Sequence, residues 1–182
     1  MQKVGILGGG QLGRMLLQSA VNYPVETFVL ENDTDCPSAH LCHHFVKGDI
    51  RNFDDVYRFG QQVDAITIEI ESVNEDALEK LEKEGKQVFP KSSALRIIKN
   101  KITQKEFYKQ HQIPTPVYVV TNNMMSLQDQ AGFIPAVHKA ATGGYDGRGI
   151  QMIRTKEDLS KGFDGPAVLE KLPLPLCLLV LP

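Results

Sequence analysis

The sequence predicts an α/β protein with two domains: a Rossmann-like parallel sheet domain, then a smaller α+β unit that begins a second domain. Three observations predict this fold. Short apolar runs alternate with amphipathic helical segments over residues 1–90, the first run ends in the turn GGGQLG, and the pattern changes at residue 92 to one long helical stretch followed by short strands. We therefore expect domains of residues 1–98 and 99–182.

The first domain opens with a strand, a glycine turn and a helix. The apolar run at residues 3–7 stops at three glycines, and further runs at residues 27–30 and 65–70 predict two more strands. Because strands that alternate with helices form parallel sheets, ligands should gather at the carboxyl edge of this sheet. Asn74 would cap the third of the expected helices, and Gly85 would end it. Three sets of apolar residues at helical spacing mark these helices: Leu12, Met15, Leu16 and Ala20; Phe53, Val56 and Tyr57; and Ala77, Leu78 and Leu81.

The second domain begins in a helical stretch at residues 92–112. This stretch ends before Pro114 and Pro116, because proline cannot continue a helix. Strands are expected at residues 117–120, 136–139, 150–153 and 167–170, with a helix start at residues 155–158. The ending, residues 172–182, carries no charge and is too short and proline-rich to span a bilayer.

Composition narrows the classes of partner. The chain has 182 residues, and its 20 Lys+Arg and 22 Asp+Glu give a net charge of -2, so we expect neither a nucleic acid nor a membrane as partner. Three cysteines make an odd number without disulfide-scaffold density, and the chain opens on an apolar strand rather than a signal peptide. Both features favour the cytoplasm.

The turn GGGQLGRM satisfies G-x-G-x-x-G at Gly8, Gly10 and Gly13. Such a turn brings backbone N–H groups to a phosphate at a helix N-terminus, and Glu31, at the end of the next strand, would take a ribose hydroxyl. The alternative is that the glycines only permit tight packing of strand and helix. The same fingerprint leaves a nicotinamide-dependent oxidoreductase open as an alternative function.

Glu69 and Glu71 lie two residues apart, so on a strand both carboxylates would face the same side. They suit a ligand amine, although a solvated strand end explains them as well.

The segment Cys36, His40, Cys42, His43 and His44 contains zinc-ligand residue types, but its spacing fits no usual zinc site. We therefore expect a loop that leads to the next strand, and no metal site.

The stretch KAATGGYDGRGI, residues 139–150, is the strongest functional signal. Lys139 ends an apolar run, and four glycines follow with Tyr145, Asp146 and Arg148 among them. Such a flap suits a triphosphate, with amide N–H groups, Arg148 and Lys139 as donors to phosphate oxygens. The lysine precedes the glycines, so this is not a Walker A loop. The alternative is a flexible hairpin.

These motifs together resemble the ATP-grasp enzymes, and within them the N5-carboxyaminoimidazole ribonucleotide synthetases of purine biosynthesis. The resemblance covers residues 1–171 and rests on five segments in the family's order: VGILGGGQLGRM at the start, IEIESV at 68–73, IIKNKITQKEF at 97–107, IPTP at 113–116 and HKAATGGYDGRG at 138–149. It implies a pre-ATP-grasp domain followed by the first subdomain of an ATP-grasp fold. It also implies a cytoplasmic homodimer that uses MgATP and bicarbonate to carboxylate the amine of 5-aminoimidazole ribonucleotide, releasing ADP and phosphate.

The resemblance also assigns residues. It places ATP at Lys101, Lys139, Glu170 and the flap residues Gly144, Tyr145, Asp146, Gly147, Arg148, Gly149 and Ile150. It places the ribonucleotide at Gly10, Gln11, Leu12, Glu69 or Glu71, Tyr145, Asp146 and Arg148, with Asp146 and Arg148 as the catalytic pair.

The chain departs from the family's pattern after Lys171. There the family continues with a second acid, the Mg²⁺-binding carboxylates and the bicarbonate site, whereas residues 172–182 carry no charge. This ending looks like a truncation or a shifted reading frame, and no metal ligand is expected in the chain itself. We therefore expect an inactive form, and a non-catalytic nucleotide-binding fragment stays open as an alternative.

Overall fold

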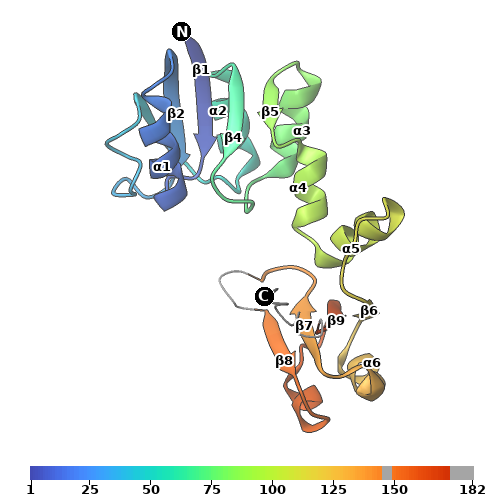
Figure 1. The fold of residues 1–182 in the computed structure, drawn as a ribbon. Helices are drawn as coiled ribbons and strands as arrows, with labels where there is room; N and C mark the ends of the chain where they lie inside the picture. The colour runs from blue at the N-terminus through green and yellow to red at the C-terminus, as the bar shows by residue number, and fades with distance from the viewer. Residues whose placement is uncertain (145–148, 173–182) are drawn as a thin grey trace, which may run out of the picture. The chain divides into compact units, whose positions relative to one another are not determined.

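The computed structural model describes residues 1–144 and 149–172. Contacts between Cα atoms divide the chain into two units, residues 1–96 and 97–182 (Figure 1). No helix in these described ranges is both long and apolar enough to span a bilayer.

The first unit is built on a five-stranded sheet in the order β3-β2-β1-β4-β5. All of its strand pairs are parallel, so the predicted parallel sheet is confirmed. Its strands are β1 Gln2–Leu7, β2 Val25–Glu31, β3 His44–Lys47, β4 Ala65–Ile68 and β5 Gln87–Phe89. The sequence reading found β1, β2 and β4 but no strand at β3 or β5, which are only 4 and 3 residues long and show little apolar pattern.

Three helices pack around this sheet: α1 Gln11–Ala20, α2 Phe53–Gln61 and α3 Glu75–Lys83. Asn74 caps α3 as predicted, because its Oδ1 accepts the N–H of Ala77 at 2.9 Å. The predicted helix at α1 is confirmed, but the apolar residues that marked it are not the buried ones: Leu12, Met15 and Leu16 are exposed, and the helix buries Gly13 and Leu17. The unit's core lies between α2, α3 and the strands, and its fully buried side chains include Phe59, Ile66, Leu78, Leu81 and Val88.

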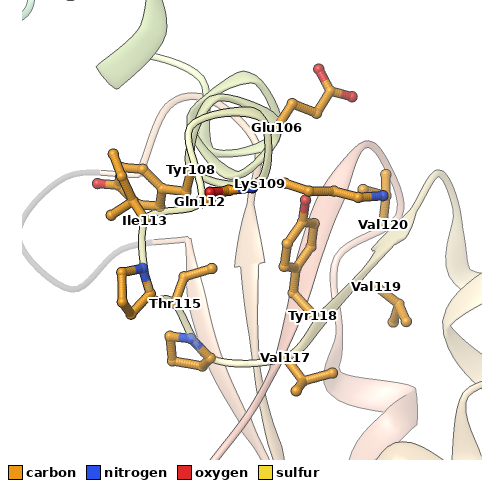
Figure 2. A pocket seen from close by; sticks show the side chains of 12 residues that line it. Glu106, Tyr108, Lys109, Gln112, Ile113, Thr115, Val117, Tyr118, Val119 and Val120 are labelled. Carbon is orange, nitrogen blue, oxygen red and sulfur yellow. The ribbon is translucent and has the colours of Figure 1, made fainter.

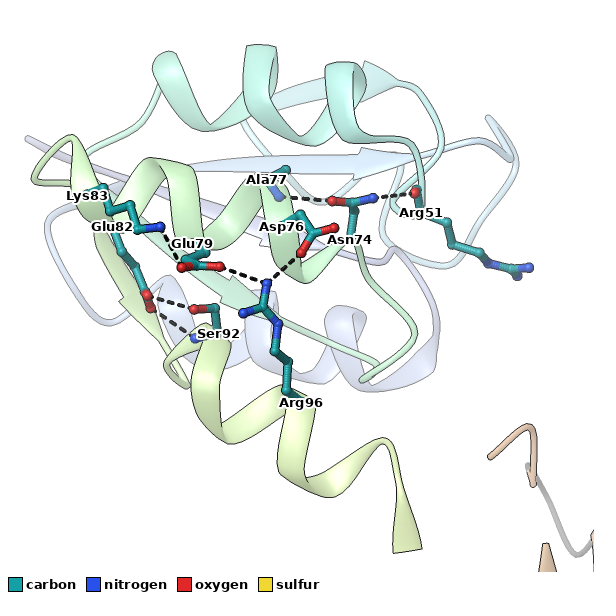
Figure 3. A network of polar contacts seen from close by, with 9 residues as sticks. All are labelled: Arg51, Asn74, Asp76, Ala77, Glu79, Glu82, Lys83, Ser92 and Arg96. Atoms are coloured by element: carbon teal, nitrogen blue, oxygen red, sulfur yellow. Dashed lines mark hydrogen bonds and ion pairs between the residues drawn. The ribbon is translucent and has the colours of Figure 1, made fainter. Parts of the chain in front are cut away.

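A polar network fixes α4, Ser92–Ile98, to α3 (Figure 3). Glu82 accepts the N–H of Ser92 at 2.9 Å and its hydroxyl at 2.8 Å. The Arg96 guanidinium pairs with Glu79 at 2.8 Å and with Asp76. We call these contacts of Ser92 and Arg96 with α3 the clasp. Its half at Ser92 is buried, and its half at Arg96 is an exposed group of ion pairs.

The predicted single helix over residues 92–112 is wrong, because the helix breaks between α4 and α5, Lys101–Gln110. Asn100 has an extended backbone, and its Oδ1 accepts the N–H groups of Ile102 at 2.9 Å and Thr103 at 3.3 Å. An asparagine that caps a new helix outcompetes continuation of the old one.

The second unit holds an antiparallel sheet in the order β6-β9-β7-β8. The four predicted strands are confirmed as β6 Tyr118–Thr121, β7 Ala136–Ala140, β8 Ile150–Ile153 and β9 Ala167–Lys171. The expected helix near residue 155 is a 3-10 helix, Glu157–Lys161, and α6 spans Met124–Gln128. The core consists of Leu127, Ala136, Ile153, Leu159 and Leu169.

Candidate nucleotide and ribonucleotide site

The glycine turn between β1 and α1 surrounds two carboxylates of its own chain. The N–H of Gly9 donates to Glu31 Oε2 at 3.1 Å, and the N–H of Leu12 donates to Glu69 Oε1 at 3.3 Å. A Cβ at Gly10 would lie 2.6 Å from Glu69 Oε1, and Gly8 has a φ of 102°. The positive φ favours glycine at position 8, and the missing side chain at position 10 lets the Glu69 carboxylate lie close to the turn.

This geometry differs from the expected phosphate cradle. Two N–H groups of the turn are already satisfied by carboxylates, and a phosphate at the same place would meet their negative charge. Glu31, expected on a ribose hydroxyl, instead bridges the N–H groups of Gly9 and Asn32. The turn suits a ligand that donates hydrogen bonds, such as an amine, better than an anion.

The structure separates the two candidate glutamates. Both lie beyond the end of β4 at Ile68, so the strand alternation expected to place them on one side does not apply. Glu69 faces the glycine turn beside Gly10 and Leu12, whereas Glu71 is exposed. Gln11 is the exposed first residue of α1.

In the second unit, three charged side chains from α5, β7 and β9 meet. Lys139 Nζ lies 2.7 Å from Glu170 Oε2, and Lys105 Nζ lies 2.9 Å from Glu170 Oε1. β7 pairs with β9, which brings Lys139 and Glu170 together although they lie 31 positions apart. With two ammonium groups on one carboxylate, the trio carries a net charge of +1, which favours an anionic ligand.

Glu170 is held in its charged form. Burial by itself raises the pKa of this carboxyl, but hydrogen bonds from Lys139 and then Lys105 outweigh it, so the pKa lies below its ordinary value. Both oxygens of Glu170 are engaged by lysines, and the described residues hold no cluster of three His, Cys, Asp or Glu side chains suited to a metal. Glu170 therefore fits a role toward ATP better than one toward Mg²⁺.

Sequence reasoning missed Lys105. It is only 5% exposed and is the one buried residue of α5. Its Nζ also donates to Thr115 Oγ1 and lies 5.9 Å and 5.6 Å from the ring centroids of Tyr108 and Tyr118. A signal was present, because Ile102, Lys105 and Tyr108 share one helix face at a spacing of three.

Three of the residues that surround Lys105 Nζ, though not Glu170, also line a cavity of about 680 Å³ (Figure 2). Tyr108 contributes from α5, Thr115 from the segment after that helix, and Tyr118 from β6.

The two ends of the flap lie close together. The N–H of Ala140 donates to the Gly149 carbonyl at 2.9 Å, and a Cβ at Gly149 would lie 3.0 Å from the Cα of Gly144. Lys101 begins α5 at this point, since its N–H donates to the Ala141 carbonyl at 2.8 Å. The remaining flap candidates, Tyr145, Asp146, Gly147 and Arg148, lie outside the described residues, and Ile150 is the exposed first residue of β8.

The cysteine and histidine segment makes separate contacts. His43 Nδ1 lies 2.8 Å from Thr27 Oγ1, and His44 Nε2 lies 2.6 Å from Glu26. His44 belongs to β3 rather than to a loop, and Cys36 is buried near Gly9.

Comparison with known proteins agrees with this architecture. Residues 1–99 match the ribonucleotide synthetase preATP-grasp domain, and residues 106–171 match the ATP-grasp domain. An N5-carboxyaminoimidazole ribonucleotide synthase of Saccharolobus solfataricus is 36% identical over 83% of this chain and 40% of its own length.

Solved structures agree as well. The synthetase of Thermotoga maritima has a TM-score of 0.85 at 30% identity, over 94% of this chain and 46% of its own. The enzyme of Aspergillus clavatus, in complex with ADP and 5-aminoimidazole ribonucleotide, has a TM-score of 0.80 at 32% identity, over 94% and 46%. This chain spans less than half the length of these relatives. It belongs to the ATP-grasp ribonucleotide synthetases, in the family of the N5-carboxyaminoimidazole ribonucleotide synthetases.

Proposed function

We propose that this chain supplies the ATP and ribonucleotide sites of a carboxylase that acts on 5-aminoimidazole ribonucleotide. The reaction joins bicarbonate to the exocyclic amine at the expense of ATP and releases N5-carboxyaminoimidazole ribonucleotide, ADP and phosphate. The observation that carries the proposal is the trio of Lys105, Glu170 and Lys139 at the base of the glycine flap.

The trio suits ATP by charge and position. Lys139 is partly exposed and can donate to phosphate oxygens, because Glu170 occupies only one of its three hydrogens. Glu170 would accept hydrogen bonds from the adenine or ribose, and Lys101 would add a second cation for the phosphates. Gly144, Gly149 and Ile150 would hold the flap that carries Tyr145, Asp146, Gly147 and Arg148 over the nucleotide.

The glycine turn suits the ribonucleotide. Glu69 faces Gly10 and Leu12, where it can accept hydrogen bonds from the ligand's amine, with Gln11 at the rim and Glu71 farther out. By analogy with the family, we propose Arg148 and Asp146 as the catalytic pair. When bound, Mg²⁺ would neutralise phosphoryl charge, and its carboxylate ligands would come from parts of the relatives that this chain does not span.

The alternative of a nicotinamide-dependent oxidoreductase is not favoured. Its pyrophosphate would need the N–H groups that Glu31 and Glu69 already hold. By analogy with the family, we further propose a cytoplasmic homodimer.

Titration calorimetry of the chain with a non-hydrolysable ATP analogue tests the site. Lys139→Ala should weaken binding by about 1.5–3 kcal/mol, since one charge-assisted hydrogen bond is lost. Lys161→Ala removes an exposed lysine of the same unit and is the control. If the two variants bind equally well, or if NADH binds and the ATP analogue does not, the proposed function is wrong.

A further inference from the structure

We propose that Lys105 is a positioning residue of the nucleotide site: it fixes the Glu170 carboxylate and thereby leaves Lys139 free to bind the nucleotide. This inference rests on the proposed function and assigns a role that neither the sequence motifs nor the relatives' descriptions give to Lys105.

The first step is that Lys105 does not reach the ligand itself. The residue is only 5% exposed, and its ammonium already has three kinds of neighbour: the Glu170 carboxylate, the Thr115 hydroxyl and the rings of Tyr108 and Tyr118. An ammonium has three hydrogens, and the carboxylate and hydroxyl each take one while the rings face the remainder. Lys105 must therefore act through the groups that it contacts.

The second step is the geometry of Glu170. Lys105 approaches Oε1 and Lys139 approaches Oε2, so the two lysines hold opposite oxygens of one carboxylate. Glu170 is 9% exposed, so water offers little replacement if either partner is lost. Without Lys105, Oε1 would be unpaired in the interior, and the carboxylate could turn both oxygens toward Lys139.

The third step is charge. With both lysines the trio carries a net charge of +1, and with Lys139 alone it would be neutral. A neutral pair attracts a polyphosphate less strongly, although Lys139 is unchanged. The predicted loss of affinity therefore arises without any lost contact between Lys105 and ATP.

The fourth step is pH dependence. The groups that face Glu170 are Lys139 from β7, Lys105 from α5, and Tyr118, which lies opposite it on β6. Removing Lys105 removes one cause of the lowered pKa of Glu170, while burial continues to raise it. Because protonation of Glu170 would leave the charge of Lys139 uncompensated, the nucleotide affinity of the variant should recover in part toward that of the parent as the pH falls toward the ordinary range of a carboxyl group.

The test is a double-mutant cycle on the full 182-residue chain, read by titration with a non-hydrolysable ATP analogue between pH 5 and 8. We expect Lys105→Met to weaken binding roughly tenfold or more at pH 7.5 and by a smaller factor at low pH. In a Glu170→Gln background, Lys105→Met should weaken binding by a smaller factor and without the pH dependence that Glu170 confers, because no carboxylate remains to neutralise Lys139. Lys109→Met, on the exposed side of the same helix, is the matched control.

Thr115→Val is the second variant, for use if Lys105→Met does not fold. Thr115 lines the cavity of Figure 2, so this change removes one hydrogen-bond partner of Lys105 without enlarging a core side chain. We expect Thr115→Val to weaken binding of the ATP analogue by a smaller factor than Lys105→Met does. If both variants bind like the parent while Lys139→Ala binds weakly, or if Lys105→Met acts equally in the Glu170→Gln background, the positioning role is wrong and the ATP site stands. If the parent chain binds no ATP analogue, the proposed function fails and this inference fails with it.

Discussion

At the residue scale, Gly10 shows how a single methyl group would disturb the proposed ribonucleotide site. A Cβ at this position would lie 2.6 Å from Glu69 Oε1, so the carboxylate would have to move. We expect Gly10→Ala to leave the melting temperature nearly unchanged, because Gly10 has an ordinary φ of -70° and the displaced group is a flexible side-chain end. Affinity for 5-aminoimidazole ribonucleotide should fall several-fold, measured by calorimetry. Gly132→Ala is the control, since its Cβ would meet nothing within 4 Å, and an equal loss there would contradict the role of Glu69.

His138 is a second residue whose environment makes a prediction. Its side chain is fully buried, with Nε2 2.9 Å from Thr121 Oγ1, and Nδ1 accepts the N–H of Phe163 at 3.3 Å. Burial lowers the pKa of His138, so the unfolded chain binds a proton at a higher pH than the folded chain. This part of the stability is complete above about pH 6.5, the ordinary histidine value, and is lost as the pH falls through the folded-state pKa. Urea denaturation at pH 7.5 and 5.5 should show a smaller pH effect in His138→Asn than in the parent; the same pH effect in both would contradict this account.

At the element scale, the two halves of the clasp between α3 and α4 should differ in strength. Ser92 is buried and donates two hydrogen bonds to the Glu82 carboxylate, whereas Arg96 and its partners are largely exposed. We expect Glu82→Ala to destabilise the chain by about 1–2 kcal/mol, because a buried N–H and hydroxyl lose their acceptor. Arg96→Ala should cost less than about 1 kcal/mol, as is usual for exposed ion pairs. Chemical denaturation of both variants gives the two losses in free energy of unfolding. A larger loss in Arg96→Ala than in Glu82→Ala would contradict this interpretation of the contacts in Figure 3.

Elements also show what the sequence could and could not predict. The strands β1, β2 and β4 and the three helices of the first unit followed from apolar runs and from the signals at Asn74 and Gly85, which act locally, whereas the short strands β3 and β5 did not. The break at Asn100 did not follow, because the same residue types continue a helix or cap a new one according to tertiary contacts. The buried face of α1 was also misjudged, since close packing at Gly13 placed Leu17, rather than Leu12, toward the sheet.

The site was predictable to a similar degree. The sequence singled out Lys139 because it ends an apolar run, whereas Glu170 was assigned by the resemblance to the family. The pairing of β7 with β9 does bring the two side chains together. The sequence did not identify Lys105 as a site residue, because a lysine on a helix is usually exposed to solvent and only the fold shows that the Lys105 side chain is buried.

At the scale of the whole molecule, the chain matches less than half of its relatives' length, and this sets an expectation for turnover. Both carboxylate oxygens of Glu170, the acid paired with Lys139, are engaged by lysines rather than left for Mg²⁺ alone. We therefore expect the 182-residue polypeptide by itself to bind ATP but to release no phosphate in response to 5-aminoimidazole ribonucleotide with MgATP and bicarbonate. Ribonucleotide-dependent phosphate release at about 1 s⁻¹ or more, typical of enzymes, would contradict this expectation.

The enclosure of Lys105 also has a consequence for covalent labelling. Acylating reagents attack the free amine of a lysine, and Lys105 offers neither an accessible nitrogen nor an ammonium without partners. Lys109, exposed one turn further along α5, would react first. A survey of lysine reactivity would thus label Lys109 and leave Lys105 unlabelled, although Lys105 is the residue whose substitution is expected to weaken nucleotide binding.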